Sequence, residues 1–388
     1  ETYEQLDRPR EAELVLKGCR QEAPFDMRVI RALSAFYRRQ KAYAALSVQL
    51  SIICREMRNA VSADPSDLQS WKNLIEVLNE QGQRRAARCC ASTSRAFDVG
   101  DAELEPLLEQ GSAAPVCRKA LRDRAIDRII APPLLNETTR LVLRSAAPAM
   151  ENLLPLELER YGAKRLKRRP TGAERALAVV CEWFGIRQVS TYSVQARLCL
   201  PVSSDPLTLL IGEPLLEETG EAEQIFLFTR AAKIAHQSLC PVMRATPLEL
   251  ALAIDALARY FDTSYEPKGV NLEKLDEMAR RIGKFIPRRV HETLGQSVYE
   301  MKGLPGFDPV LLPEAAQEMG ARSALVAIGD SVAALGALLA LGESGVRAGR
   351  SETLAAVSAQ PEASALYTFA LSDVFFDACQ KAQQAEEG

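Results

Sequence analysis

Hydrophobic residues recur every three or four positions along most of the chain, a spacing typical of amphipathic helices. Thr171 precedes Glu174 by three residues, which is the spacing of a capping box, and Thr246 and Glu249 repeat it. In the part of the chain after residue 115 the predicted helices cover residues 116–130, 134–146, 171–184, 221–237, 246–260, 272–283, 288–301, 313–328, 330–341 and 362–383.

A different pattern occupies residues 187–212, where hydrophobic residues alternate with polar ones. The segment is divided by the turn-forming residues 203–206 and ends at Gly212. Alternation of this kind indicates strands with one buried face. We expect a small antiparallel sheet of two or three strands here.

The first hundred residues contain an internal repeat. The matching pairs, each 41 positions apart, are Pro24 and Pro65, Ile30 and Trp71, Leu33 and Leu74, Tyr37 and Leu78, and Ala45 and Ala86. Small residues at helix crossings and large apolar residues between them are typical of stacked helical hairpins. We predict two hairpins with a long helix over residues 42–63, preceded by the closing helix of an earlier hairpin over residues 9–19.

The second copy resembles a tetratricopeptide repeat. The residues at the family's positions are Pro65, Trp71, Leu74 and Ala87. Ile75, Leu78 and Ala91 stand where Gly, Tyr and Phe are usual. The resemblance implies a mainly α fold, with a tetratricopeptide-like hairpin array over residues 1–112 and a helix-dominated α+β domain over residues 113–388. A generic bundle of helical hairpins is the alternative.

Charge and composition exclude several classes of protein. The 388 residues include 48 Lys and Arg against 51 Asp and Glu, so the net charge is −3. This balance argues against wrapping nucleic acid or lying on an anionic membrane. The apolar segment 323–341 is interrupted by Asp330, which suits a buried helix and not a membrane span.

The cysteine pattern bears on location. Nine Cys occur without a C-x-x-C pair, which favours a reducing compartment over a disulfide framework. The chain begins at Glu1 without a Met or a signal-peptide pattern, so we expect a cytoplasmic protein and a start inside a longer chain.

Catalytic chemistry has few candidates, because only two His are present. A strand pair followed by a helix that contains residues 228–236 resembles the core of zincin metallopeptidases, which bind zinc through H-E-x-x-H. Residues 230–234 lack these ligands, and the dipeptide His291-Glu292 is followed by Gly295 in place of the second His. The resemblance therefore implies a degenerate, metal-free domain and no enzyme. A hydrolase with an unrecognised site is the alternative function.

A second possible metal site involves the other His of the chain. His236 and Cys240 lie one helical turn apart, and Cys199 on a predicted strand is the nearest third ligand. Tetrahedral zinc requires a fourth ligand, so a buried Cys and a hydrogen-bonded His are the favoured interpretation. We expect no metal and no other cofactor.

The combination of repeats and a later helical domain resembles the large tetratricopeptide-repeat proteins of myxobacteria and related gliding bacteria. The segments that carry this resemblance are residues 226–232 and 325–330. It implies a non-catalytic scaffold or adaptor that binds a protein or peptide in the groove of the repeats. The residues expected to contact this partner are Arg28, Arg31, Arg38, Gln69, Lys72, Asn73 and Glu76.

Two other features invite a role in contacts. A basic run before Pro170 comprises Lys164, Arg165, Lys167, Arg168 and Arg169. It could attract an acidic partner, although a solvated helix end or loop is the favoured interpretation. The predicted helix over residues 116–130 is expected to cover the last hairpin and so to fix the array against the second domain.

Overall fold

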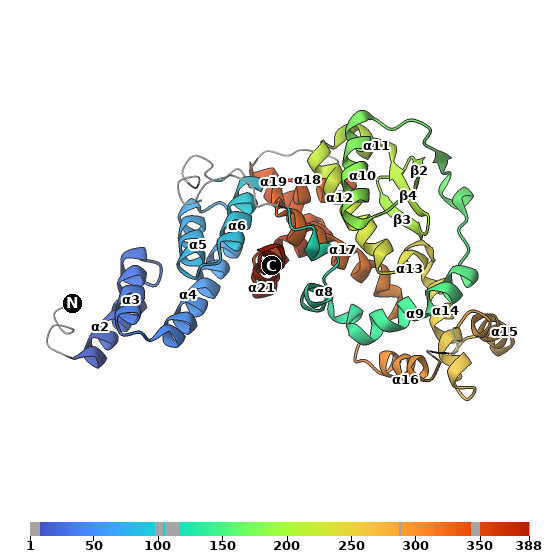
Figure 1. Ribbon diagram of the computed structural model, residues 1–388, viewed down its shortest axis with the longest axis horizontal. Coiled ribbons are helices and arrows are strands. Elements are labelled where there is room, and N and C mark those ends of the chain that lie inside the picture. The colour runs from blue at the N-terminus through green and yellow to red at the C-terminus, as the bar shows by residue number, and fades with distance from the viewer. Residues whose placement is uncertain are drawn as a thin grey trace.

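The computed structural model describes residues 8–97, 99, 104, 116–286, 289, 291–342 and 350–387. These residues form a mainly helical, elongated molecule with one small sheet (Figure 1). The first helices lie at one end of the long axis, and the sheet lies towards the other. The predicted domain boundary at residues 112–113 falls outside the described residues. None of the described helices is long and apolar enough to cross a membrane.

Five helices form what we call the hairpin array: α2 (Pro9–Glu22), α3 (Met27–Arg39), α4 (Tyr43–Ala63), α5 (Leu68–Glu80) and α6 (Arg84–Ala96). The long α4 agrees with the helix predicted over residues 42–63. Large apolar side chains fill the space between the hairpins. Trp71 is fully buried, and its Nε1 donates a hydrogen bond to the carbonyl oxygen of Pro65 at 2.9 Å. Ile30, 41 positions earlier, is equally buried.

The ends of α3 and α5 repeat the same geometry. Asp26 and Asp67, 41 positions apart, are the N-caps, and each side chain accepts a hydrogen bond from a backbone N–H of the first turn. After each helix the chain turns at a residue of positive φ, which is 53° at Lys41 and 74° at Gly82. The next N–H returns to the carbonyl five residues earlier in both cases. The 41-residue period is therefore a period of structure as well as of sequence.

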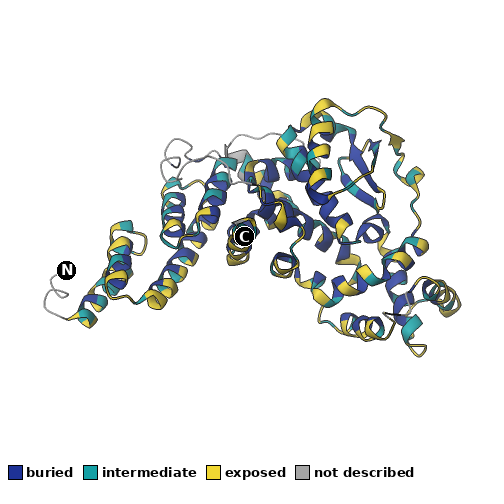
Figure 2. Ribbon diagram, in the orientation of Figure 1, coloured by how far each residue is buried: buried dark blue, intermediate teal, exposed yellow. Residues whose placement is uncertain are grey.

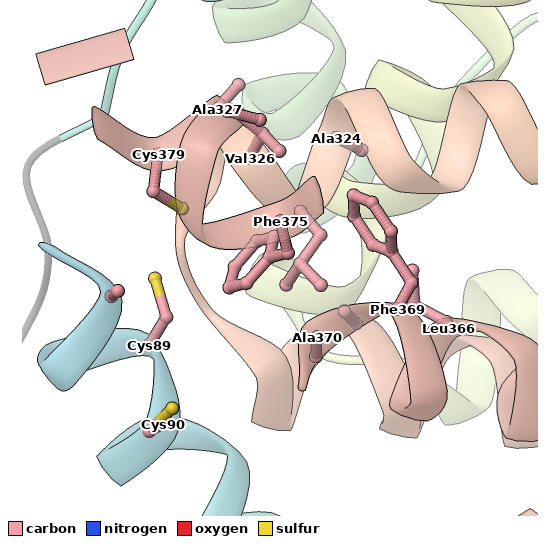
Figure 3. Packing of buried hydrophobic residues seen from close by; sticks show 14 of the residues in the cluster. Cys89, Cys90, Ala324, Val326, Ala327, Leu366, Phe369, Ala370, Phe375 and Cys379 are labelled. Carbon is pink, nitrogen blue, oxygen red and sulfur yellow. The ribbon is translucent and has the colours of Figure 1, made fainter. Parts of the chain in front are cut away.

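The last helix of the array packs against the end of the chain. The partners of α6 are α18 (Ser331–Leu341), α20 (Pro361–Ala370) and α21 (Asp373–Glu387). We call this contact the seam. In Figure 3 the sulfur of Cys89 on α6 faces the sulfur of Cys379 on α21, beside the ring of Phe375. The prediction that residues 116–130 provide the main cover of α6 is wrong, because the C-terminal helices occupy that face.

Residues 116–130 also fail to form one helix. They form a 3-10 turn, η2 (Lys119–Leu121), and then α8 (Arg124–Ile130). Asp123 breaks the helix because its side chain accepts the Ala125 N–H and starts α8 as an N-cap. The turn η2 packs on α21 and on α17 (Leu312–Ile328).

The sheet has four strands: β1 (Lys164–Arg165), β2 (Val189–Val194), β3 (Cys199–Ser204) and β4 (Leu207–Gly212). Their order is β1-β2-β4-β3. The β2–β4 pair is parallel, and the other two pairs are antiparallel. The predicted antiparallel sheet is therefore wrong in its topology. The reason is burial: every residue of β4 is buried, so β4 takes a central position between β2 and β3.

The remaining helices and turns surround this sheet or extend beyond it. Before and beside the sheet lie η3 (Pro133–Leu135), α9 (Glu137–Leu153), η4 (Leu158–Tyr161) and α10 (Thr171–Phe184). After the sheet come α11 (Glu213–Glu218), α12 (Glu221–His236), α13 (Cys240–Arg244), α14 (Pro247–Phe261), α15 (Leu272–Gly283), α16 (His291–Lys302), η6 (Pro309–Leu311) and α19 (Arg350–Ala359).

Two helix predictions and one cap prediction need correction, and one capping box is confirmed. The helix predicted over residues 134–146 is α9, which begins at Glu137 and extends to Leu153. The helix predicted over residues 362–383 is split into α20 and α21, because Ser372 Oγ accepts the Phe375 N–H and starts a new helix. Thr171 is not a cap, since the N-cap of α10 is Pro170, which offers no side-chain acceptor. The capping box at the start of α14 forms as predicted.

The centre of the C-terminal region is the crossing of α12 with α17, which Figure 2 shows as buried ribbon. Gly320 of α17 permits this close approach, because a Cβ there would lie 2.9 Å from the carbonyl oxygen of Arg230. α12 also packs on β3 and α10. The helix therefore connects the sheet to the C-terminal helices that hold the array.

Candidate functional site

The predicted partner-binding residues lie on the first helices of the two hairpins, and several of them pair with each other. Arg31 of α3 forms an ion pair with Glu76 of α5 at 2.6 Å, and Arg38 pairs with Glu80 at 2.5 Å. These arginines span the two helices on their exposed side. Arg31, Arg38 and Glu76 therefore form a polar strip, which is held in place by ion pairs between the hairpins.

A second set of contacts anchors the N-terminal end of this strip. Gln69 Nε2 donates to Asn73 Oδ1 at 2.7 Å, and Asn73 Nδ2 donates to the carbonyl oxygen of Phe25 at 3.2 Å. Asn73 is buried, so its role is to join the hairpins rather than to meet a partner. Arg28 is exposed and pairs with Asp26, the N-cap of its own helix.

Phe25 is the residue that sequence reasoning missed. Its side chain is 43% exposed, so an aromatic ring is available at the surface beside the polar strip. The signal for it was its place between Pro24 and the cap Asp26, where a turn holds the ring away from the helical core. We use the name array face for Phe25 together with the predicted residues other than the buried Asn73: Arg28, Arg31, Arg38, Gln69, Lys72 and Glu76.

The basic run begins on the edge of the sheet and continues into the loop before α10, which agrees in part with the loop interpretation. Lys164 and Arg165 form the edge strand β1, opposite Ser193 and Tyr192 of β2. Lys167, Arg168 and Arg169 follow in the loop before α10. Among the described residues, none of these five cations forms an ion pair within 4.0 Å. Charged side chains on a short edge strand prevent further strand pairing, which accounts for Lys164 and Arg165 without a partner.

Buried ion pairs hold α12, the helix whose sequence resembles a zincin helix, against other parts of the chain. Lys233 is fully buried in α12, and its Nζ donates to Asp127 Oδ1 at 2.6 Å and to the carbonyl oxygen of Leu121 at 2.7 Å. Gln237 Nε2 donates to the second carboxylate oxygen of Asp127 at 2.8 Å. Burial lowers the pKa of Lys233, and the charge of Asp127 opposes this shift. Arg230, also buried, pairs with Glu362 of α20.

These pairs are long-range structural contacts. They connect α12 to α8 and to α20, and they leave no ligand set on the helix. Such pairs retain charge in a dry interior only when both partners and their hydrogen bonds are complete, as they are for Lys233 and Asp127. The buried face of α12 therefore stabilises the fold of the C-terminal region.

The alternative metal ligands are not brought together. Cys240 and Cys199 are buried, and burial raises the pKa of each thiol to about 12. His236 lies exposed at the end of α12, with its ring 5.8 Å from that of Phe184. Within the described part of the chain, no group of three or more His, Cys, Asp or Glu side chains is arranged to hold a metal ion. All nine cysteines are free thiols.

The comparisons with known proteins add no assignment to this geometry. No protein-family description, no curated protein and no solved structure matches the chain.

Proposed function

We propose that the chain is a non-catalytic scaffold that binds a protein or peptide on the array face. The observation that carries the proposal is the exposed ring of Phe25 at one end of a strip of arginines held by ion pairs. Exposed aromatic and Arg side chains are the residue types that contribute most to binding at protein interfaces. Arginines already held by Glu76 and Glu80 lose less side-chain entropy when a partner docks.

The proposal treats α3–α4 and α5–α6 as tetratricopeptide-like hairpins. Its support is the repetition of caps and turns at 41 residues, at Asp26 and Asp67 and again at Lys41 and Gly82. Stacked hairpins of this kind present their first helices along one surface. A cytoplasmic location is part of the same proposal, and it is supported by the nine free thiols.

The test is affinity capture with variants of the full chain, followed by quantitative mass spectrometry. The double variant Phe25→Ser and Arg31→Ala removes the ring and one strip arginine from exposed positions. We expect at least about a tenfold loss of the captured partner, because interface anchors each contribute about 1 kcal/mol or more. Arg55→Ala, at an exposed position of α4, is the matched control and should retain full capture.

Circular dichroism of both variants checks that the helices persist. Capture by the double variant at the level of the parent would contradict the proposal. Equal losses in the double variant and in Arg55→Ala would also contradict it, because the array face would then have no special role.

A further inference from the structure

A cavity of about 570 Å³ lies between α14 and α16, at the opposite end of the molecule from the start of the array (Figure 1). Its volume is in the range of small-molecule sites. The cavity shares no residue with the array face, so it raises a separate question about a separate ligand.

The walls of the cavity are aromatic. Phe261, Tyr265 and Tyr299 line it, and Ala258 and Val298 provide an apolar floor. Tyr299 is 79% exposed, so its ring stands at the mouth with little cover from the protein. An apolar ligand body would therefore gain burial against both the floor and the rings.

Phe261 is held firmly in this wall. Its ring centroid lies 5.0 Å from that of His291, and a Cβ at Gly295 would lie 2.9 Å from Phe261 Cδ1. The glycine thus lets the ring approach the backbone of α16. The wall is preformed, which lowers the ordering cost of binding.

One ammonium group that lines the cavity belongs to the protein itself, at the side chain of Lys302. Lys302 Nζ lies 2.7 Å from Asp255 Oδ1 and 5.0 Å from the ring centroid of Tyr265. Tyr265 donates its hydroxyl hydrogen to the same carboxylate oxygen at 2.7 Å. Burial alone would lower the pKa of Lys302, but its bonds to Asp255 and Tyr265 outweigh burial, and the pKa is raised. This lysine is therefore neutralised by its own partner.

The outer part of the cavity carries the opposite charge. Glu292, in the first turn of α16, and Asp262, just after α14, both line it. Asp262 Oδ1 accepts bonds from the N–H and hydroxyl of Ser264, which fixes the carboxylate. Among the described residues no Lys, Arg or His forms an ion pair within 4.0 Å with either Glu292 or Asp262. Within the described residues, therefore, two carboxylates line a cavity of aromatic rings and neither of them is held in an ion pair.

We propose that this cavity binds an amphipathic organic cation, with an ammonium group near Glu292 and Asp262 and an apolar body against the aromatic wall. Ring faces attract ammonium groups, most strongly where water is partly excluded. The Lys302, Tyr265 and Asp255 contact shows this chemistry within the same cavity. An anion would meet two carboxylates and a lysine that is already paired.

The experiment uses the purified full chain and three probes of similar size: benzyltrimethylammonium, phenylacetate and benzyl alcohol. Binding is measured by isothermal titration calorimetry at low ionic strength. We expect the cation to bind with a Kd of about 1 mM or tighter, and at least about tenfold more tightly than the other two probes.

Variants then locate the site. Glu292→Gln and Tyr299→Ala, both at exposed positions, should each weaken cation binding about fivefold or more. Glu300→Gln, on the same helix but outside the cavity lining, is the control and should bind as the parent does. The proposal is overturned if the cation does not bind at 10 mM, if phenylacetate or benzyl alcohol binds as tightly, or if Glu292→Gln and Tyr299→Ala leave its affinity unchanged. Loss of partner capture at the array face would not affect any of these outcomes.

Discussion

At the scale of single residues, the two copies of the repeat differ at one position with a clear physical cost. Lys41 and Gly82 occupy equivalent positions in the turns that follow α3 and α5, and both have positive φ, at 53° and 74°. A side chain in this left-handed region costs about 1–2 kcal/mol, whereas glycine adopts it without strain. The first copy therefore contains a strained residue where the second has the residue that suits the turn.

Exchange of these residues gives a reciprocal prediction. Lys41→Gly should raise the free energy of unfolding by about 0.5–1 kcal/mol, because the relief of strain exceeds the extra chain entropy of glycine in the unfolded state. Gly82→Lys should lower it by a similar amount or more. Urea unfolding followed by circular dichroism measures both, and a destabilised Lys41→Gly variant would contradict the assignment of strain.

At the scale of elements, α12 is the helix on which the C-terminal region depends. It contacts the sheet, α10, α17 and α18, and its buried Lys233 reaches back to α8 through Asp127. Removal of one partner leaves an uncompensated charge in a dry interior, and this costs more than the loss of the pair as a whole. The consequence is a specific ranking of variants.

Lys233→Met should lower the free energy of unfolding by about 3–5 kcal/mol, because Asp127 stays charged and buried. The double variant Lys233→Met and Asp127→Leu should recover most of this loss. Lys274→Met, at an exposed position of α15, is the control, and it should change stability by less than about 0.5 kcal/mol. Denaturant midpoints give the ranking; a single Lys233→Met variant as stable as the parent would contradict it.

At the scale of the whole molecule, the seam joins the hairpin array to the C-terminal helices. Arg85 of α6 is buried and donates to the carbonyl oxygens of Val326 at 2.5 Å and Ala327 at 3.2 Å, at the end of α17. Thr93 Oγ1 bonds Ser331 Oγ at 2.9 Å across the same contact. Buried polar bonds of this kind favour one fixed arrangement of the array against the C-terminal region.

The chain has two Trp, and they report the two sides of the seam separately. Trp71 lies in α5 of the array, and Trp183 lies in α10 beyond the seam. In each single-tryptophan variant, Trp71→Phe or Trp183→Phe, we expect the fluorescence transition of the remaining Trp to coincide with the circular dichroism transition of the whole chain. Two separate transitions at different denaturant concentrations would contradict a firm seam.

The same reporters test the segment that precedes α8. Leu121 is fully buried in η2, which packs on α17 and α21. Leu121→Asp should destabilise both reporters together by several kcal/mol, because it places a charge in the core. Leu14→Asp, at a position that is 69% exposed, is the control and should have little effect.

The sequence by itself determined the features that depend on contacts within a few turns. The capping box of Thr246 and Glu249 follows from neighbouring residues, and the 41-residue repeat can be found by comparing the sequence with itself. Most helix limits could be predicted for the same reason, except where a local cap such as Asp123 or Ser372 interrupted a longer periodic run, and except at α9, which extends to Leu153 beyond the predicted end at residue 146. Helical spacing also predicts which polar residues of α3 and α5 are exposed, but it does not show that Asn73 is buried between the hairpins.

Only the tertiary structure decided which distant segments meet. The insertion of β4 between β2 and β3, the pairing of Lys233 with Asp127, and the cover of α6 by the C-terminal helices all join residues far apart in sequence. Hydrophobic burial drives these contacts but has no direction, so periodicity cannot name the partner of a buried face. For the same reason the sequence shows Glu292 only as part of an incomplete zinc motif. The packing of α16 against α14 places this residue in the lining of a cavity.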